Sequence, residues 1–241
     1  LTIIDLHICG KRKKRAGVYY TKLVNNYMKK QITFLILARG GSKRLKNKNI
    51  KKFFGKPLLH WTIIQALRIA KKNKVILSSE DNRVKSLAKK YKNLIISDRP
   101  KYLAKDTTTS IEVIKNVLEE FKIKGLVILL QPTSPLRKDI DIKKALITLK
   151  AGASAVMSQT QLNYNSSQTT YNSKKFLPLN AKKLKIYYPN GAVFGASSDW
   201  LVKNKTFYNK SVKTFNMPVS RSIDIDYKYQ FDIAEKLFED V

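Results

Sequence analysis

The 241-residue sequence has one cysteine, few acidic residues and no long apolar run. Because Cys9 has no second cysteine to pair with, the sequence excludes a disulfide-stabilised scaffold and predicts a reducing, cytoplasmic location. No apolar stretch approaches the roughly 18 residues that cross a bilayer, so we expect no spanning segment. Hydrophobic residues still make up 43% of the chain, which favours a buried core and excludes wholesale disorder.

The shortage of acids leaves a large positive charge. The chain has 17 Asp and Glu residues against 48 Lys and Arg, a formal net charge of +31, which raises the question of a nucleic-acid partner. Lysine pairs such as Lys71/Lys72 and Lys143/Lys144 recur along the whole chain, and only residues 11–15 form a compact basic run. We interpret the charge as a solvated, lysine-rich surface and predict no specific nucleic-acid partner. A dedicated nucleic-acid-binding face is the alternative.

The chain divides into two parts of different character. Residues 1–30 show no clear period and are predicted to be a basic N-terminal extension, either poorly ordered or not part of the native protein, with a genuine basic arm as the alternative. Residues 31–241 alternate between apolar runs and helix-period segments. Strands are expected at 32–37, 74–78, 93–97 and 125–130, and helices at 58–71, 82–91, 108–123 and 139–150. This order predicts an α/β fold with a doubly wound, mostly parallel sheet.

The pattern loosens after residue 150. We expect strands at 153–159 and 191–195, a further extended segment as far as Pro218, and an amphipathic helix over 227–240. Residues 160–189 are polar and lack a helical period. Such a long excursion from the domain is interpreted as a segment for substrate closure or dimer contacts.

The first loop carries the strongest chemical signal. Residues 38–49 follow a buried strand and contain two glycines, a serine hydroxyl and several cations. Glycines allow backbone N–H groups to curl round an anion and cations neutralise it, so the loop predicts a polyphosphate site. It lacks the spacing of a Walker loop. The alternative is an ordinary glycine turn with solvated lysines.

Two aspartates near the end of the chain form a second signal. Asp224 and Asp226 lie two residues apart on a segment expected to be extended, which places both carboxylates on one face. That spacing suits a hard divalent cation, and Mg²⁺ is implied, with Mn²⁺ as a substitute. One aspartate would remain available to accept a proton. A solvated acidic turn is the alternative.

These segments resemble a known family, the CMP-sugar synthetases, which include N-acylneuraminate (CMP-sialic acid) cytidylyltransferases and their relatives for legionaminic, pseudaminic and 3-deoxy-octulosonic acids. Residues 38–49 resemble the family's nucleotide-binding signature, and 130–137 its LQPTSPLR loop. Residues 99–107, 189–194 and 222–226 resemble three further motifs in the same order. The resemblance spans residues 31–240 and implies a Rossmann-like nucleotidyltransferase domain with a small dimerisation excursion.

The resemblance also implies a reaction, in which the anomeric hydroxyl of a 2-keto sugar acid attacks the α-phosphorus of CTP and pyrophosphate leaves. Such chemistry depends mainly on positioning and charge neutralisation. The partners implied are CTP, the sugar acid and a second copy of the chain in a homodimer. Catalysis is assigned to Arg39, Lys48 and Asp226, and metal binding to Asp224 and Asp226. The nucleotide is assigned to Arg39, Gly40, Gly41, Ser42, Lys43, Lys48 and Asn49, and the sugar to Gln131, Thr133, Ser134 and Asn190.

The identity of the sugar acid stays open, because the sequence departs from the sialic-acid pattern. Members that use sialic acid usually carry an Arg-Gln pair and a Leu-Pro before the 189–194 motif, whereas this chain reads Ala-Lys-Lys-Leu-Lys-Ile over 181–186. Lys182 or Lys183 would then receive the sugar carboxylate, without the planar fork of an arginine. Octulosonate and pseudaminate are alternative substrates. A basic nucleic-acid-binding relic of the fold is the alternative from another class.

Overall fold

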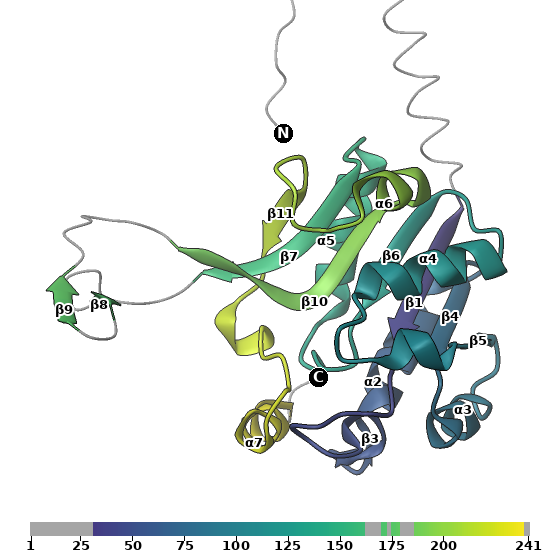
Figure 1. Ribbon diagram of the computed structural model, residues 1–241, viewed down its shortest axis with the longest axis horizontal. Helices are drawn as coiled ribbons and strands as arrows, with labels where there is room; N and C mark the ends of the chain where they lie inside the picture. Colours follow the sequence, from purple (N-terminus) through teal and green to yellow (C-terminus); the bar gives the residue numbers. More distant parts are fainter. Residues whose placement is uncertain (1–30, 162–169, 173–174, 179–185, 239–241) are drawn as a thin grey trace, which may run out of the picture.

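The computed structural model describes residues 31–161, 170–172, 175–178 and 186–238. Its centre is a 7-stranded sheet with the strand order β11-β7-β10-β6-β1-β4-β5 (Figure 1). β10 runs antiparallel to both of its neighbours, whereas the pairs β1–β4, β1–β6, β4–β5 and β7–β11 are parallel. The strands are β1 (Ile32–Leu37), β4 (Lys74–Ser79), β5 (Leu94–Asp98), β6 (Leu126–Leu130), β7 (Ala155–Gln161), β10 (Tyr187–Ser197) and β11 (Lys213–Asn216).

Helices cover both faces of the sheet. Alternate side chains of each strand point to opposite faces, so Phe34 and Ile36 pack against α2, α3 and α5, whereas Leu35 packs with α4 and α6. This arrangement confirms the predicted α/β fold with a doubly wound, mostly parallel sheet. The helices are α2 (Leu58–Ala70), α3 (Asn82–Ala88), α4 (Ser110–Glu120), α5 (Asp139–Lys150), α6 (Ser198–Asn204) and α7 (Lys228–Leu237).

A third, smaller core joins α7 to the beginning of the domain. The hairpin of β2 (Lys52–Phe53) and β3 (Lys56–Pro57) places Phe53 edge-on against Phe231 and Phe238, with ring centroids 5.3 and 5.0 Å apart. Ile225 is fully buried in the same cluster. Its burial fixes the short segment 222–226 that carries the two aspartates.

The structure differs from the sequence prediction at residues 198–204, where an extended segment was expected and helix α6 is found. The prediction was wrong because the large buried residues of this helix, Trp200 and Leu201, are adjacent in the sequence and show no helical period. Its signals are local: the Ser197 side chain accepts a hydrogen bond from the Trp200 N–H at 3.2 Å, and Trp200 and Leu201 enter the core. Three 3-10 turns, η1 (Lys48–Ile50), η2 (Lys101–Ala104) and η4 (Val219–Arg221), were also not anticipated.

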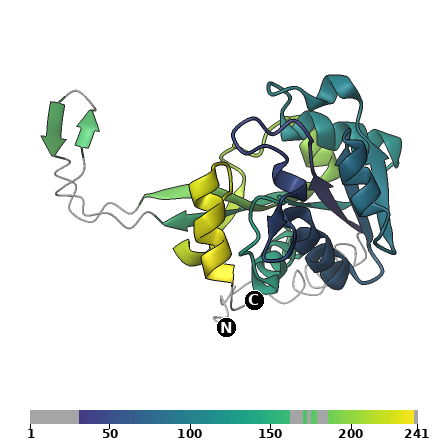
Figure 2. The same cartoon turned by 90° about the horizontal axis from the view of Figure 1, so that it is seen from below.

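The predicted excursion at 160–189 is described only in part. β7 and β10 pair as far as Tyr187 with Gln161, and β8 (Thr170–Asn172) pairs with β9 (Lys175–Pro178) in a separate two-stranded sheet. Figures 1 and 2 both place this small sheet apart from the main one. The remainder of the excursion lies outside the described residues, as does the extension 1–30. Their roles stay predictions.

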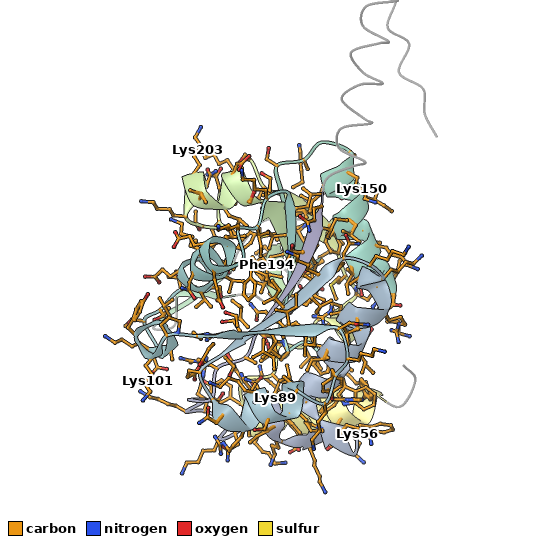
Figure 3. The ribbon with its side chains drawn as sticks, turned by 90° about the vertical axis from the view of Figure 1, so that its right-hand side faces the viewer. Lys56, Lys89, Lys101, Lys150, Phe194 and Lys203 are labelled. Carbon is orange, nitrogen blue, oxygen red and sulfur yellow. The ribbon has the colours of Figure 1, made fainter. Side chains whose placement is uncertain are left out.

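Lysines of the described chain are spread over its surface. Figure 3 shows Lys56, Lys89, Lys101, Lys150 and Lys203 projecting from different parts of the molecule, while Phe194 lies in the interior. Among the described residues there is no helix with the length and apolar character needed to cross a membrane.

Candidate active site

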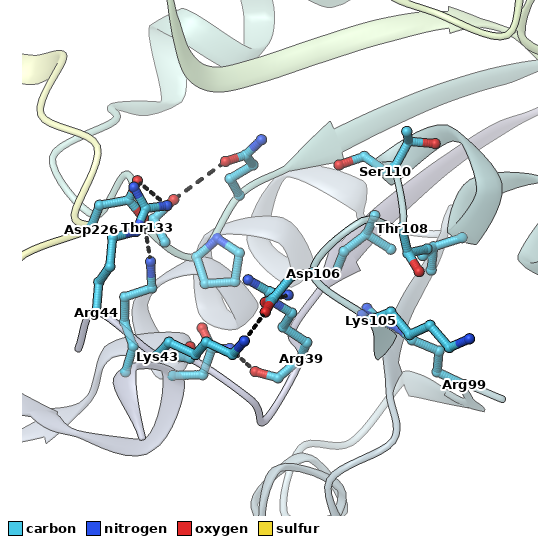
Figure 4. Close-up of a pocket in the computed structure, with 18 of the residues that line it drawn as sticks. Arg39, Lys43, Arg44, Arg99, Lys105, Asp106, Thr108, Ser110, Thr133 and Asp226 are labelled. Carbon is cyan, nitrogen blue, oxygen red and sulfur yellow. Dashed lines mark hydrogen bonds and ion pairs between the residues drawn. The ribbon is translucent and has the colours of Figure 1, made fainter. Parts of the chain in front are cut away.

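A cavity of about 380 Å³ opens at the carboxyl ends of β1 and β6 (Figure 4). The loop after β1, the loop after β6, the segment between β5 and α4, and the segment before α7 form its walls. This is the edge of an open α/β sheet where ligands bind. Its polar and charged lining residues are Arg39, Ser42, Lys43, Arg44, Lys48, Asn49, Arg99, Lys105, Asp106, Thr108, Thr109, Ser110, Gln131, Thr133, Asp224 and Asp226.

One pair of cations in the loop 38–49 meets an aspartate from the opposite wall. Arg39 Nη1 lies 2.7 Å from Asp106 Oδ1, and Lys43 Nζ lies 2.5 Å from Asp106 Oδ2. Figure 4 shows Asp106 between the two cationic side chains. The ion pairs with Lys43 and Arg39 lower the pKa of the Asp106 carboxyl. These cations therefore already hold an anion in the cavity.

A second pair of cations holds Asp226. Lys48 Nζ lies 2.9 Å from Asp226 Oδ1 and also donates a hydrogen bond to the Ile225 carbonyl at 2.7 Å. Arg44 Nη2 lies 2.9 Å from Asp226 Oδ2, and its guanidinium lies over the Tyr227 ring. The predicted residues Lys48 and Asp226 are thus brought together although 178 positions separate them.

Asp224 is held quite differently. Its Oδ1 is buried and has no hydrogen-bond partner within the described part of the chain. Burial raises the pKa of the Asp224 carboxyl, and the neighbouring Thr133, Lys48 and Arg44 only partly oppose that shift. Gly191, with φ +75°, backs onto the carboxylate: a Cβ there would lie 3.1 Å from Asp224 Oδ2. The buried, unpartnered oxygen marks a position for a ligand.

Of the other predicted nucleotide-binding residues, some line the first cavity and some do not. Ser42 and Asn49 line the cavity, and the Asn49 amide donates to the Arg39 carbonyl at 2.8 Å, which fixes the start of the loop. Gly40 and Gly41 are not among the lining residues. The Gly40 N–H donates to Glu80 Oε1 at 2.7 Å, and Glu80 does not line the cavity either.

The predicted sugar-binding residues are also divided. Gln131 and Thr133 line the cavity, whereas Ser134 is fully buried behind it. Asn190 is buried in the irregular pairing of β7 and β10, where its Oδ1 accepts from Ser158 Oγ at 2.6 Å and its Nδ2 donates to Ser222 Oγ at 2.8 Å. Asn190 nevertheless borders a second cavity.

This second cavity, of about 400 Å³, shares Asp224 with the first. Aromatic and apolar side chains line most of it, and its described lining includes no lysine or arginine. The lining residues are Tyr188, Pro189, Asn190, Val219, Ser222, Ile223, Asp224, Tyr229, Gln230 and Ile233. Two cavities that meet at one carboxylate can hold two reactants side by side.

Four charged residues of the first cavity, Arg44, Arg99, Lys105 and Asp106, had no role in the sequence prediction. Arg44 is one of the cations of loop 38–49, and Arg99 and Asp106 belong to the motif over 99–107, so the signal was present in the sequence. Arg99 is nearly buried, and its Nη2 donates to the Ser78 carbonyl at 2.8 Å. Burial lowers its pKa.

Arg137, at the end of the 130–137 motif, supports the site from behind. It is 1% exposed, and its Nη1 donates to the carbonyls of Gln131 at 3.2 Å and Ala192 at 2.8 Å. Burial lowers the pKa of this guanidinium to about 10, so it stays charged at neutral pH. The buried cation thereby joins the loop after β6 to strand β10.

The residues present fit a divalent cation that a phosphorylated substrate helps to hold. In the described chain, no group of three or more His, Cys, Asp or Glu side chains gathers to bind a metal alone. Asp224 offers a buried, unpartnered carboxylate oxygen, and Asp226 lies beside it with both oxygens paired to cations. Mg²⁺ is commonly bound by one or two carboxylates together with substrate phosphates.

Comparison with known proteins agrees with this site. The family described as "Cytidylyltransferase" matches residues 33–240. The chain is 30% identical over 224 residues to a CMP-N,N'-diacetyllegionaminic acid synthase of Legionella pneumophila, covering 87% of this chain and 97% of that protein. It is 33% identical over 218 residues to an N-acylneuraminate cytidylyltransferase of Escherichia coli, covering 86% of this chain but only 52% of that longer protein.

A solved structure extends the likeness to the fold. The structure of a CMP:2-keto-3-deoxy-manno-octonic acid synthetase complexed with CTP superposes with a TM-score of 0.67 at 17% identity, covering 86% of this chain and 98% of that one. The family match includes the cation-rich loop and both aspartates of the first cavity. The chain belongs to the cytidylyltransferase family of nucleotidyltransferase enzymes.

Proposed function

We propose that this enzyme transfers CMP from CTP to a nonulosonic acid such as an N-acylneuraminate or a legionaminate and releases pyrophosphate. The observation that carries the proposal is the first cavity, where four cations of one loop (Arg39, Lys43, Arg44 and Lys48) face Asp224 and Asp226. A triphosphate needs several cations, and a carboxylate pair suits its accompanying metal. The relatives named above support CTP as the donor and an acidic sugar as the acceptor.

The triphosphate would take the place of Asp106. That carboxylate is exposed and bridges Arg39 and Lys43, so a ligand with more negative charge can compete for both cations. Lys48 is the least exposed cation of the loop, with 12% of its side chain exposed, and it is fixed by the Ile225 carbonyl. Its fixed position suits it to stabilise charge that develops at the α-phosphate.

The sugar acid would occupy the second cavity. Its hydroxyl would then reach the α-phosphorus next to Asp224, the carboxylate that borders both cavities. Asp224, whose pKa is raised by burial, suits proton acceptance better than Asp226, both of whose carboxylate oxygens are paired with cations. Of the predicted sugar-binding residues, Asn190 lines this cavity, whereas Gln131 and Thr133 line the first cavity and would contact the sugar acid only where the two cavities meet at Asp224. Fully buried Ser134 would support the loop from behind rather than contact the sugar.

Mg²⁺, or Mn²⁺ in its place, would be held by Asp224 and Asp226 together with nucleotide oxygens. When bound, the ion supplies neutralisation of phosphate charge. Asp226 must first be released from Lys48 and Arg44, and an incoming triphosphate offers those cations an alternative partner.

Three further predictions belong to this proposal. The sugar carboxylate needs a cation that the described lining of the second cavity does not provide, and the candidates Lys182 and Lys183 lie outside the described residues. The polar excursion at 160–189 would bring residues to the site of a second copy in a homodimer. The single cysteine and the nucleotide substrate favour a cytoplasmic location.

The direct test is pyrophosphate release from CTP in the presence of N-acylneuraminate, legionaminate, pseudaminate or 3-deoxy-octulosonate, with UTP, ATP and GTP as control donors. We expect CTP-dependent release with a nonulosonic acid, and its loss when chelator is added and its return with Mg²⁺. Faster release with octulosonate would select the alternative acceptor. Release that persists in chelator-treated protein would contradict the metal assignment, and no turnover with any donor would contradict the proposal.

The alternative of a nucleic-acid-binding relic makes a different prediction. Such a protein would show no turnover with any of these acceptors and would bind one nucleic acid tightly at physiological salt. The carboxylates in the first cavity argue against it, because phosphate binding alone has no use for paired acids among the cations.

A further inference from the structure

The loop 38–49 contacts Glu80 and Asp81, the two acidic residues that follow strand β4. The Gly40 N–H donates to Glu80 Oε1 at 2.7 Å, and the Ala38 N–H donates to the Ser78 carbonyl at 3.0 Å. Glu80 does not line the first cavity, whereas Arg39, Ser42 and Lys43 do. Glu80 therefore contacts the loop without lining the cavity.

Asp81 limits the same loop sterically. A Cβ on Gly40 would lie 2.2 Å from Asp81 Oδ2 and 2.7 Å from Asp81 Cβ, which is closer than any real contact. Asp81 cannot readily move away, because Arg83 binds both of its carboxylate oxygens, at 3.1 and 2.7 Å, and its Oδ1 also accepts the Arg83 N–H at 2.8 Å. Gly40 has no positive φ, so this contact alone requires a glycine.

Glu80 also lies close to Arg99, which lines the first cavity. Its Oε2 is buried, has no hydrogen-bond partner in the described chain, and lies 3.8 Å from Arg99 Nη1. Arg99 in turn is fixed on the Ser78 carbonyl. One carboxylate thus contacts the loop after β1 with one oxygen and lies near a cavity arginine with the other.

We propose that Glu80 and Asp81 are positioning residues that hold loop 38–49 in the shape that receives the nucleotide phosphates. This inference rests on the proposed function, since it assigns the loop to phosphate. Glu80 accepts from Gly40 and so fixes the direction in which Arg39 leaves the backbone. Asp81 forms the surface against which Gly40 packs.

The first test uses hydrogen exchange, which requires no nucleotide. Glu80→Ala removes the acceptor for the Gly40 N–H, and Glu80→Gln keeps an amide oxygen in the same place. We expect faster exchange across residues 38–44 in the alanine variant and near-normal exchange in the glutamine variant. Glu120→Ala is the control, because Glu120 accepts a 2.6 Å bond from Ser97 Oγ and does not line the first cavity. Unchanged exchange in Glu80→Ala overturns the role of Glu80.

The second test uses CTP binding, measured by calorimetry without the sugar acid. Gly40→Ala should weaken binding by about 100-fold, the cost of a small displacement of a positioned group. Lys46→Ala is the control in the same loop, because Lys46 is exposed and does not line the first cavity. Adding Asp81→Gly to Gly40→Ala removes the obstructing side chain and should restore at least tenfold of the lost affinity, with Asp81→Gly alone as reference.

The outcomes separate this inference from the proposed function. If wild-type protein binds no nucleotide, the proposed function fails, and the exchange experiment still decides whether Glu80 holds the loop. If wild-type protein binds CTP and Gly40→Ala binds it equally well, or Asp81→Gly restores nothing, the role of Asp81 is overturned. If Gly40→Ala does not fold, a kinetic comparison of Glu80→Ala with Glu80→Gln replaces the binding test. We expect a rise in KM for CTP only in the alanine variant. Equal KM values in the two variants overturn the inference.

Discussion

At the scale of single residues, the aspartates of the site pair with the same cations that the phosphates of a nucleotide would bind. Asp106 is paired with Arg39 and Lys43, and Asp226 is paired with Lys48 and Arg44. Each aspartate keeps two cations in place without a ligand. A nucleotide that brings several negative charges can replace Asp106 and free Asp226 for a metal.

The cations of the loop should differ sharply in their contribution to turnover. Arg39→Ala and Lys48→Ala are expected to lower kcat by about 10²- to 10³-fold, because each removes a positioned charge that faces the reacting phosphates. Lys46→Ala is the control, since Lys46 is exposed in the same loop and does not line the cavity. Steady-state rates of pyrophosphate release measure all three. Wild-type rates in the first two variants would remove the phosphate assignment.

Replacing Asp106 should make nucleotide binding tighter. Asp106→Asn removes the carboxylate that competes with phosphate for Arg39 and Lys43, so Kd for CTP should fall by about two- to fivefold at low salt, as expected for exposed ion pairs. Asp232→Asn removes a comparable exposed pair with Lys228 on α7 and should leave Kd unchanged. Titration calorimetry at low ionic strength provides the measurement, and weaker binding by Asp106→Asn would show that Asp106 assists the nucleotide.

The two aspartates before α7 should affect stability in opposite directions. Desolvation disfavours the ionised form of Asp224, whose Oδ1 is buried without a hydrogen-bond partner in the described chain, so Asp224→Asn should raise Tm of the metal-free protein at pH 7. Asp226→Asn removes ion pairs with Lys48 and Arg44 and should lower Tm by about 2–4 °C, equivalent to roughly 1 kcal/mol. Both variants should lose most turnover. A decrease of Tm in both would show that Asp224 is structurally satisfied.

At the scale of elements, backbone and capping hydrogen bonds hold the segments of the site together. The Ile225 N–H donates to the Thr133 carbonyl at 2.8 Å, which ties the aspartate segment to the loop after β6. Gln230 Oε1 accepts the N–H groups of Asp226 and Tyr227, at 2.7 and 2.9 Å, and so fixes the start of α7. The glutamine thus caps the first turn of the helix.

Helix α2 carries a contact that should make stability depend on pH. His60 Nδ1 lies 2.6 Å from the Tyr91 hydroxyl just after α3, and burial, assisted by Lys56, lowers the His60 pKa. The folded protein therefore binds this proton less readily than the unfolded chain, whose histidine pKa is about 6.5. The contribution of His60 is complete above that pH and is lost as the pH falls below it towards the folded-state pKa.

Because His60 becomes protonated more readily in the unfolded chain, we expect a lower free energy of unfolding at pH 5.5 than at pH 7.5. Urea unfolding of wild-type protein and of His60→Asn at both pH values measures it, since asparagine retains a polar group near the position of Nδ1. The decrease in the free energy of unfolding from pH 7.5 to pH 5.5 should be smaller in His60→Asn than in the wild-type protein. An equal decrease in both proteins would assign the pH dependence to other groups.

At the scale of the whole molecule, the charge of +31 is distributed rather than focused. Exposed lysines lie on most elements of the described chain, whereas the four cations of loop 38–49 that line the first cavity are paired with carboxylates. Diffuse charge of this kind attracts any polyanion weakly and without regard to sequence.

Removing residues 1–27 should therefore change little besides non-specific binding. The deletion takes away six basic residues and one acidic residue. We expect unchanged kcat and KM, together with DNA affinity that is weak in both proteins and disappears as salt rises. Steady-state kinetics and fluorescence anisotropy with an unrelated DNA duplex test this. Tight binding to one nucleic acid at physiological salt, or loss of turnover on deletion, would contradict it.

The sequence by itself determined the sheet, most of the helices and the family. Continuous apolar runs such as 125–130 and the stripe of Ile111, Ile114 and Leu118 are local patterns, because burial imposes a fixed period on strands and helices. The collinear motifs placed Arg39, Lys48, Asp224 and Asp226 among the site residues, and the structure brings these four together in one cavity. Helix α6 was missed, because its signals are one cap and two core residues.

Only the tertiary structure decided how those residues are held. Periodicity contains no information on contacts between distant segments, such as Glu80 beneath Gly40, Asp106 across from Arg39, or Arg137 between Gln131 and Ala192. Whether an aspartate has a buried oxygen without a partner, as Asp224 does, or is paired with two cations, as Asp226 is, depends on which segments the fold packs around it. Two residues that look equivalent in the sequence therefore acquire different chemistry, because burial and neighbouring charge are properties of the folded chain.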